Sequence, residues 1–433
     1  MIHKKLVQYG AGNIGRGFIG ELFARSGYEV VFIDVQEAVV EQLNRDREYP
    51  VKYISDEGSH ETMITGVRAV NGRDMDAVAR EIADADIMAT AVGVPVLPRI
   101  VKPIAHGLKY RWETGNDSPL DIILCENKLD ADKYLRELFS QEFSAEENEK
   151  FTKTVGLIEA SIGRMVPVMT PEMQEGNPLR VCVESYAELP VDGHAMKGEI
   201  PRVPGLVTTS PFSYYIRRKL FIHNMGHSLT AYLGRLHGNT YIAQAIRNPH
   251  IRLIAECAMR QSARALSREY REYGKELEGI LDHVDDLILR FHNSALGDTT
   301  ERVGRDPIRK LAAEDRLAGA AIFCDERKLP CAYITIGLAA GLLYENAEDA
   351  GSLKIQEIVR EKGISRAITE ICGIVPDSDA GCQTILFYEM LKSGRELGEI
   401  LHEADLQASR TIHGTCGACL RESCNDNGLD FAP

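Results

Sequence analysis

The sequence has 433 residues, of which 44% are hydrophobic and 26% are charged, so its length predicts two or three globular domains rather than a small disulfide-stapled module. Its 50 Lys and Arg against 64 Asp and Glu give a net charge of −14, which argues against a general nucleic-acid or anionic-membrane surface. The longest uncharged apolar run, 332–344, is shorter than the ~20 residues that cross a bilayer, and the first residues lack the features of a signal peptide. We therefore expect a cytoplasmic protein with reduced cysteines and no membrane or nucleic-acid partner.

The first third of the chain alternates short β-branched runs with helix-like stretches, which is typical of a parallel α/β sheet. The helix after the first strand should turn Phe18, Leu22 and Phe23 inward, and the polar segment 111–119 should be a surface excursion. A connector rich in Pro and Gly, 190–211, ends this half. Strands of one sheet are expected at 6–9, 29–34, 87–91, 121–125, 155–158 and 180–183.

After Ser213 helical periodicity dominates, with amphipathic helices expected at 241–272 and 353–369. The sequence therefore predicts an α/β protein in which an N-terminal Rossmann-type, doubly wound domain (1–205) is followed by a mostly α-helical substrate and catalytic domain (206–433). We expect ligands in the cleft between the two domains, because ligands gather at domain interfaces and at the carboxyl ends of strands.

The glycine-rich turn at 10–15 (GAGNIG) matches the G-x-G-x-x-G pattern that binds the pyrophosphate of a dinucleotide. A strand precedes it, a helix follows it, and Asp34 ends the next strand. A carboxylate at that position binds ribose hydroxyls and repels a 2′-phosphate, so we expect NAD rather than NADP. The turn at 90–93 follows a later strand and should also face the cofactor. The expected cofactor-binding residues are Gly10, Gly12, Asn13, Ile14, Gly15, Asp34, Thr90, Val92 and Gly93.

The segment 219–227 (KLFIHNMGH) gathers functional side chains on one apolar stretch. On a helix, Lys219, His223 and His227 are four residues apart and share a face, with Asn224 beside them. A desolvated lysine can act as a base near neutral pH, and an amide with an imidazole can orient a developing oxyanion. From spacing alone an ordinary amphipathic helix with a snorkelling lysine is the favoured interpretation, and the two histidines lack the intervening Glu and the third ligand of a zinc site.

The arrangement of Lys219, Asn224 and His227 resembles the signature of the polyol-specific long-chain dehydrogenases, the mannitol dehydrogenase family. The similarity runs from the first strand to about residue 400, because several further motifs occur in the family's order. These motifs are 9–20 (YGAGNIGRGFIG), 125–127 (CEN), 162–167 (IGRMVP), 189–201 (LPVDGHAMKGEIP) and 302–311 (RVGRDPIRKL).

The resemblance implies an enzyme that interconverts a polyol and a ketose, or their phosphates, without a metal. It implies that Lys219 is the general base, that Asn127 and Asn224 hold the substrate oxygen, and that His227 binds substrate hydroxyls. We expect the NAD-dependent interconversion of mannitol-1-phosphate and fructose-6-phosphate by a monomer or homodimer.

A phosphorylated substrate needs cationic side chains, and two basic clusters, 217–219 and 302–310, could supply them. The resemblance implies a substrate-binding Arg and Lys eight residues apart, a spacing that Arg302 and Lys310 match. Asp298 and Asp306 could instead pair with these arginines, and Arg164 is a further weak candidate. The expected phosphate-binding residues are Arg218, Arg302, Arg309 and Lys310.

Two alternatives stay open at this point. The first is a related enzyme that acts on a free hexitol or on a hexuronate such as tagaturonate or fructuronate, and the second is a non-catalytic NAD(H)-sensing protein. The last residues carry His413, Cys416, Cys419 and Cys424, a spacing that zinc or an iron–sulfur cluster could use. A chain end with reduced thiols is the favoured interpretation, so no metal is expected.

Overall fold

The computed structural model describes residues 4–128 and 130–414, and Cys416, Cys419 and Cys424 lie outside them, as does the side chain of His413. The chain divides into two compact units between Ile216 and Arg217, within helix α8 (Phe212–Arg218). The boundary at 205/206 stays a proposal for where the two domains part.

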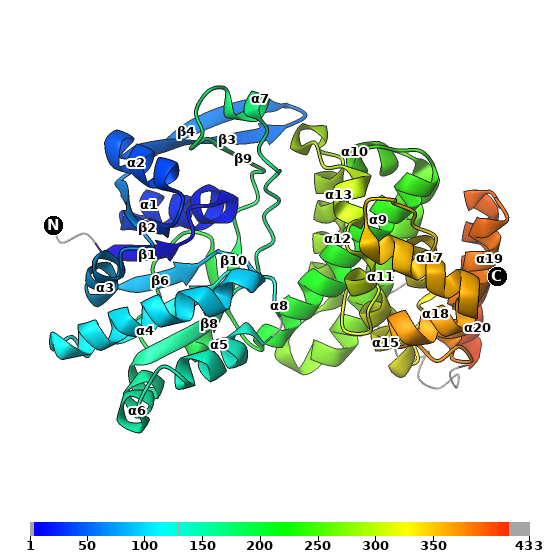
Figure 1. The fold of residues 1–433 in the computed structure, drawn as a ribbon. Helices are drawn as coiled ribbons and strands as arrows, with labels where there is room; N and C mark the ends of the chain where they lie inside the picture. The colour runs from blue at the N-terminus through cyan, green and yellow to red at the C-terminus, as the bar shows by residue number, and fades with distance from the viewer. Residues whose placement is uncertain (1–3, 129, 415–433) are drawn as a thin grey trace. The chain divides into compact units, whose positions relative to one another are not determined.

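The first unit is built on a six-stranded, all-parallel sheet with the order β5-β2-β1-β6-β7-β8 (Figure 1). This order is the doubly wound one, in which the direction of the winding reverses between β1 and β6. The Rossmann prediction is confirmed, because five of the expected strands form in this sheet within a residue or two of their expected ends. The sixth strand of the sheet, β5, was not expected from the sequence. The strands are β1 (Lys5–Tyr9), β2 (Glu29–Asp34), β5 (Val67–Asn71), β6 (Ile87–Thr90), β7 (Leu120–Leu124) and β8 (Val155–Glu159).

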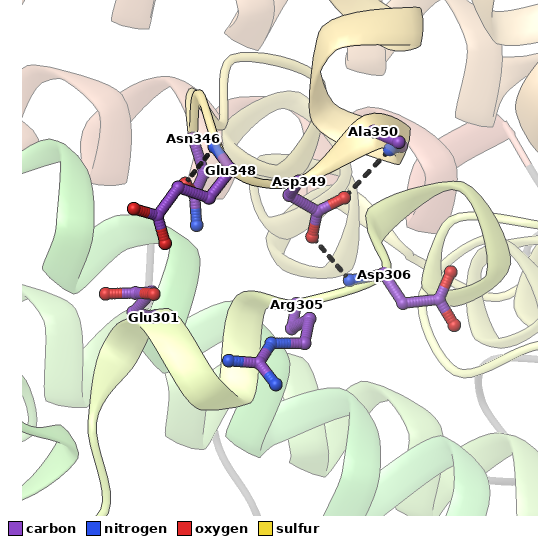
Figure 2. Close-up of a pocket in the computed structure, with 8 residues that line it drawn as sticks. Glu301, Arg305, Asp306, Asn346, Glu348, Asp349 and Ala350 are labelled. Atoms are coloured by element: carbon purple, nitrogen blue, oxygen red, sulfur yellow. Dashed lines mark hydrogen bonds between the residues drawn. The ribbon is translucent and has the colours of Figure 1, made fainter.

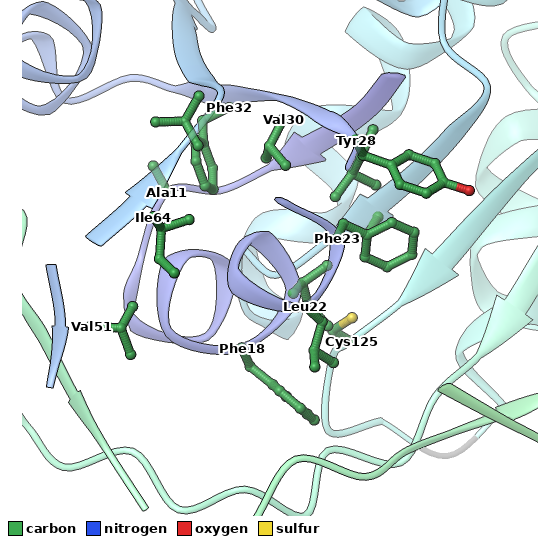
Figure 3. Close-up of a cluster of buried hydrophobic side chains, with 14 of the residues drawn as sticks. Ala11, Phe18, Leu22, Phe23, Tyr28, Val30, Phe32, Val51, Ile64 and Cys125 are labelled. Carbon is green, nitrogen blue, oxygen red and sulfur yellow. The ribbon is translucent and has the colours of Figure 1, made fainter. Parts of the chain in front are cut away.

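Two hydrophobic cores cover the two faces of this sheet. Successive side chains of a strand point to opposite faces, so Leu6 belongs to one core and Val7 to the other. The core around Leu6 holds the predicted inward residues Phe18, Leu22 and Phe23, all of them buried (Figure 3). The opposite core is covered by α3 (Met75–Ala83), α4 (Leu97–Glu113), α5 (Ala131–Ser140) and α6 (Ala145–Thr154).

One strand prediction was wrong in its pairing. The expected strand at 180–183 forms, as β9 (Val181–Val183), but it pairs in parallel with β3 (Glu48–Ser55) and not with the main sheet. The sequence reading missed β3 and its antiparallel partner β4 (Gly58–Thr65), whose side chains are largely exposed and show no continuous apolar run. The remaining elements of this unit are η1 (Gly15–Gly20), α1 (Glu21–Arg25), α2 (Glu37–Asp46), η2 (Val94–Val96), α7 (Pro171–Gln174), β10 (Leu189–Asp192), η3 (Gly193–Ala195) and β11 (Leu206–Thr209).

The polar segment at 111–119 is only partly the surface excursion that was expected. Arg111 is buried at the end of α4, where its guanidinium donates to the carbonyl oxygens of Ala83 at 2.7 Å and Ala85 at 2.9 Å. A long charged side chain can thus hold a turn together from inside, which composition alone does not reveal.

The second unit is helical, as predicted, and α16 (Ala332–Leu342) is buried all around. The two long helices that the sequence suggested are each interrupted: Asn248 and Pro249 restart the first as α11, and Gly363, at φ +79°, breaks the second. The helices are η4 (Lys219–Asn224), α9 (Met225–Leu236), α10 (Ile242–Ala245), α11 (Pro249–Tyr270), η5 (Arg271–Tyr273), α12 (Leu277–Phe291), η6 (Ser294–Leu296), α13 (Thr300–Gly304), α14 (Pro307–Lys310), α15 (Ala318–Glu326), α17 (Ala350–Lys362), α18 (Ile364–Ala367), η7 (Ile368–Cys372), α19 (Asp379–Lys392) and α20 (Leu397–Gly414).

Helix α9 packs so closely against its neighbours that two glycines are required. A Cβ on Gly226 would lie 2.5 Å from the sulfur of Met259 on α11, and one on Gly337 of α16 would lie 2.9 Å from Leu229. These contacts fix the helix that follows the 219–224 segment. Within the described ranges, no helix combines the length and the apolarity that a membrane crossing requires.

A buried ion pair connects the glycine-rich turn's helix to the segment 162–167. Arg164 and Glu21 have side chains only 0% and 2% exposed, and they are directly paired. Arg164 also donates to the carbonyl oxygens of Gly17 at 2.9 Å and Glu184 at 3.1 Å. The Arg164 side chain is thus fully buried and already paired with a carboxylate, so the suggestion that it binds a substrate phosphate finds no support in its surroundings.

Replacing Arg164 by Met should lower the free energy of unfolding of the first unit by about 3 kcal/mol, because it leaves a buried carboxylate without its main partner. The chain's one tryptophan, Trp112, lies in this unit, so urea titration followed by its fluorescence measures the change. Arg45→Ala, which removes an exposed pair with Asp46, is the control and should leave the transition in place. An unchanged transition for Arg164→Met would contradict the assignment.

Candidate functional site

The glycine-rich turn follows β1 and has the shape that a dinucleotide requires. Gly10 adopts φ +96°, and a Cβ there would lie 2.6 Å from the carbonyl oxygen of Ala91. A Cβ on Gly15 would collide with the carbonyl of Gly10, whereas one on Gly12 would meet nothing within 4 Å. Two glycines are therefore needed for packing, and the backbone at Gly12 is open, as the close approach of a pyrophosphate requires.

The backbone N–H and the carbonyl of Ala11, within this turn, each have a side-chain partner. Its N–H donates to the Asp34 carboxylate at 2.7 Å, and its carbonyl accepts from the buried guanidinium of Arg16. The second carboxylate oxygen of Asp34 accepts from the Gln36 N–H at 3.0 Å. Asn13 donates to the Pro167 carbonyl at 3.3 Å, so the turn also contacts the 162–167 segment. Asp34 and the turn thus form one preformed unit.

The turn at 90–93 stands beside the glycine-rich turn, because β6 is the neighbour of β1. The Ala91 N–H donates to the Tyr9 carbonyl at 2.8 Å, and Gly93 adopts φ +86°. Sequence reasoning missed Glu126, whose buried carboxylate accepts from the Thr90 hydroxyl at 2.7 Å and the Val92 N–H at 3.0 Å. Asn127 follows Glu126 directly and is exposed.

In the second unit, the predicted catalytic segment is π-helical over Lys219–Asn224, inside a continuous helix formed by α8, η4 and α9. A π-helix has i→i+5 backbone hydrogen bonds, so one of its turns holds more residues than the 3.6 of an α-helix. The sequence reading placed residues four apart on one face of a regular α-helix, and the π-helical turn changes this spacing. Such turns occur frequently at functional sites.

An aromatic and cationic cluster surrounds the histidines of this segment. The ring of His227 stacks on that of Phe291, with centroids 5.0 Å apart, and His223 lies 5.9 Å from the same ring. Burial, followed by the positive charge of Arg290, lowers the pKa of His223 well below its usual range. Burial likewise lowers the pKa of His283, so both imidazoles are neutral at pH 7.

Asp298 connects two of the predicted site residues. Its carboxylate lies 3.1 Å from Nε2 of His227 and accepts from Nε of Arg302 at 2.6 Å. Burial by itself raises the pKa of Asp298, but the hydrogen bonds and charges of His227 and Arg302 bring it below the usual value. The structure therefore brings His227 and Arg302 together through one ionised carboxylate, and it confirms the suggested pairing of Asp298 with an arginine.

The other predicted phosphate-binding residues differ in their exposure and in their partners. Arg309 is exposed and pairs with Asp306 at 2.6 Å and Asp315 at 3.1 Å. Lys310 is buried and donates to the Val303 carbonyl at 2.6 Å. Arg218 is half-buried at the end of α8.

A surface pocket near the 302–310 cluster does not have the lining of a phosphate site. Figure 2 shows Asp349 accepting from the Asp306 N–H, at 2.8 Å, so that its carboxylate closes one wall. Four carboxylates surround one arginine there, and an anion would be repelled. The lining residues are Glu301, Arg305, Asp306, Asn346, Glu348, Asp349, Ala350 and Gly351. In the residues that the structure describes, no three His, Cys, Asp or Glu side chains are arranged to hold a metal ion.

Comparison with known proteins places both units in one family. The family model described as Mannitol dehydrogenase Rossmann domain matches residues 4–205, and that of the Mannitol dehydrogenase C-terminal domain matches residues 212–370. A mannitol-1-phosphate 5-dehydrogenase of Bacillus pumilus (strain SAFR-032) is 37% identical over 376 residues, which are 87% of this chain and 97% of that protein. A protein of the same name from Brevibacillus brevis is 36% identical over 85% of this chain and 93% of its own length.

Among solved structures, the fold is similar to that of Pseudomonas fluorescens mannitol 2-dehydrogenase in a ternary complex with NAD and D-mannitol. The TM-score is 0.71, the identity is 14%, and the match covers 93% of this chain and 94% of that one. At this identity the likeness concerns the fold.

Lys310 gives the second unit a measurable pH dependence. Burial first of all, and then the charge of Arg316, lower the pKa of Lys310 to about 7. Because an unfolded lysine keeps its proton to about pH 10, the lysine of the unfolded chain binds more protons between pH 7 and 10 than the lysine of the folded chain, and the contribution of Lys310 to stability rises with pH. The gain approaches ~1 kcal/mol per pH unit in this window.

Urea titrations followed by far-UV circular dichroism at pH 7.5 and 9.0 test this through the difference in unfolding free energy between wild type and Lys310→Met, which should shift in favour of wild type at the higher pH. Lys392→Met, at an exposed position, is the control and should change with pH as wild type does. If wild type and Lys310→Met change equally with pH, the lysine is not responsible.

Proposed function

Because the chain belongs to the mannitol dehydrogenase family, we propose that it is an NAD-dependent dehydrogenase that interconverts mannitol-1-phosphate and fructose-6-phosphate. The single observation that carries this proposal is the 37% identity to a mannitol-1-phosphate 5-dehydrogenase over 97% of that protein's length. The matching set of Lys219, Asn224 and His227 supports it, because a protein that only senses a dinucleotide needs no base beside hydrogen-bond donors. We further propose that it is cytoplasmic and acts as a monomer or homodimer.

The cofactor proposal depends on the turn and on Asp34. The open backbone at Gly12 fits a pyrophosphate, and the half-buried Asp34 carboxylate stands at the end of β2, where ribose hydroxyls bind in this fold. A 2′-phosphate would meet the negative charge of that carboxylate at close range, which favours NAD over NADP. When bound, the nicotinamide of NAD accepts or returns the hydride.

For the chemical step, we assign the base to Lys219. In polyol oxidation, its neutral amine takes the hydroxyl proton at Nζ as the hydride leaves the same carbon, and in ketose reduction the ammonium returns that proton. Asn127 and Asn224 donate to the substrate oxygen as negative charge develops on it. No metal is required in this scheme, because the proton goes to the lysine and the charge is held by amides.

His227 is assigned to the substrate's other hydroxyl groups. Stacking on Phe291 and the bond to Asp298 hold its ring in one orientation, and Asp298 in turn is held by Arg302. We assign the substrate phosphate to Arg218, Arg302, Arg309 and Lys310. The Asp298 carboxylate already accepts a hydrogen bond from the Arg302 guanidinium. A substrate phosphate would therefore have to share this guanidinium with Asp298.

Oxidation of NADH in the presence of fructose-6-phosphate, fructose, tagaturonate or fructuronate tests the function. We expect fructose-6-phosphate to give the highest kcat/KM, because only it offers the phosphate that the basic residues bind. A higher kcat/KM for fructose would instead indicate a free-hexitol enzyme, and one for either uronate would indicate a hexuronate reductase.

Lys219→Ala should lower kcat by at least about 10²-fold, because it removes the general base, and should change the Kd for NADH less than twofold. Stopped-flow turnover and NADH fluorescence titration measure the two effects. The control is Lys354→Ala, at an exposed position of α17, which should behave as wild type. Retained turnover in Lys219→Ala would remove this lysine from the role of base.

Asp34→Ala should reduce the preference for NAD over NADP by about tenfold or more, because it removes the charge that repels a 2′-phosphate. It should also weaken binding of both dinucleotides, since the Ala11 N–H loses its acceptor. The kcat/KM ratio for the two cofactors measures the first effect. An unchanged ratio would show that selectivity lies elsewhere.

A further inference from the structure

The side chain of Glu126 crosses between two strand ends of the main sheet. It follows β7 on the chain, but its carboxylate reaches the turn after β6, where Thr90 and Val92 donate to different oxygens, at 2.7 Å and 3.0 Å. The Gly93 N–H also faces this carboxylate. Glu126 is only 6% exposed, so these protein groups, and not water, are its partners.

Burying the Glu126 carboxylate costs desolvation free energy, and the need to fill space does not account for a charged side chain here. Burial raises the pKa of Glu126, and the donors from Thr90 and Val92 only partly offset it. An apolar side chain of similar size would fill the space without this desolvation, but it would leave the buried Thr90 hydroxyl and the half-buried Val92 N–H without their acceptor. The charge is therefore present because of the turn that it holds.

The turn that Glu126 holds lies where a Rossmann sheet binds its ligand. The strand order reverses between β1 and β6, and the crevice beyond that point is where a dinucleotide lies in such sheets. The turn at 90–93 includes Gly93 in a left-handed conformation, and Ala91 is pressed against Gly10. A change in the conformation of this turn would therefore displace the backbone beside the cofactor.

Glu126 is also the residue before Asn127, to which the proposed function assigns the substrate oxygen. The backbone just before Glu126 is bound to the same turn, because the Cys125 N–H donates to the Thr90 carbonyl at 3.0 Å. One buried side chain thus links the turn that faces the cofactor to the residue assigned to the substrate.

We infer that Glu126 is a positioning residue, which fixes the 90–93 turn and Asn127 relative to each other so that cofactor and substrate oxygen are held in register. This inference rests on the proposed function for the role of Asn127. Its effect on the cofactor turn depends only on the Rossmann fold of the first unit.

Glu126→Gln keeps the size of the side chain but exchanges one acceptor oxygen for an NH₂ donor, so at least one of the turn's donors loses its partner. We expect the Kd for NADH to rise about tenfold and kcat with fructose-6-phosphate to fall by at least as much. The primary isotope effect measured with 4-deuterated NADH should increase, because hydride transfer becomes slower relative to product release.

Asp121→Asn is the matched control. Asp121 lies at the other end of β7, is also buried, and accepts from the N–H groups of Lys197 at 2.8 Å and Gly198 at 3.0 Å. It should lose a similar amount of thermal stability and yet keep the wild-type Kd and isotope effect within twofold. A residue with a merely structural role changes the fraction of active protein, which active-site titration measures, and leaves both values unaltered.

Thr90→Val removes the hydroxyl that donates to the Glu126 carboxylate. This variant remains informative if Glu126→Gln fails to fold. Its effect on the Kd should be smaller, and in the double variant the two effects should not add, because both remove the same contact. NADH binding and an isotope effect within twofold of wild type in Glu126→Gln and Thr90→Val would overturn the inference. If wild type reduces none of the four ketoses while Glu126→Gln still weakens NADH binding, the proposed function fails and the positioning of the cofactor turn is supported.

Discussion

The approach of Gly10 to the carbonyl of Ala91 is the constraint on which the first unit depends. Strand β1 lies between β2 and β6, and where it ends its two neighbours lead into separate turns. The Gly10 N–H donates to Ile33 on one side, at 2.8 Å, while Ala91 donates back to Tyr9 on the other. Because no side chain fits between them, both turns meet at one edge of the sheet and leave room only for backbone.

Three carboxylates hold the proposed site by accepting hydrogen bonds from groups of the protein. Asp34 holds the Ala11 N–H, Glu126 holds the turn after β6, and Asp298 orients His227 while pairing with Arg302. Each of them fixes a group that the proposed function assigns to cofactor or substrate. These three negative charges are already satisfied inside the protein, so the net charge of −14 does not by itself argue against the anionic substrate that we propose.

The sequence predicted the parts of the structure whose signal is local. Buried parallel strands are continuous apolar runs, and the glycine-rich turn has a fixed spacing, so both were found close to their observed positions. The hairpin β3–β4 was missed because β4 is largely exposed and because the mostly buried β3 is interrupted by Pro50 and Lys52, so neither carries a continuous apolar run. The π-helical turn at 219–224 has no sequence signature. Glu126 and Asp298 were not found as positioning groups, because their partners are distant in sequence and meet only in the fold.

The π-helical turn between α8 and α9 has a consequence for how the second unit can vary. A π-helical turn is equivalent to one residue inserted into a regular α-helix, and the flanking helices remain in their own phase. Deleting one residue between Lys219 and Asn224 would restore a regular helix, in which these two residues are four apart, and the flanking helices would keep their phase. Helix α9, with Gly226 against Met259, would therefore stay where it is. The extra residue thus shapes only the segment 219–224. Its effect would be on the spacing of the side chains in that segment, and the packing of the helices around it would not depend on it.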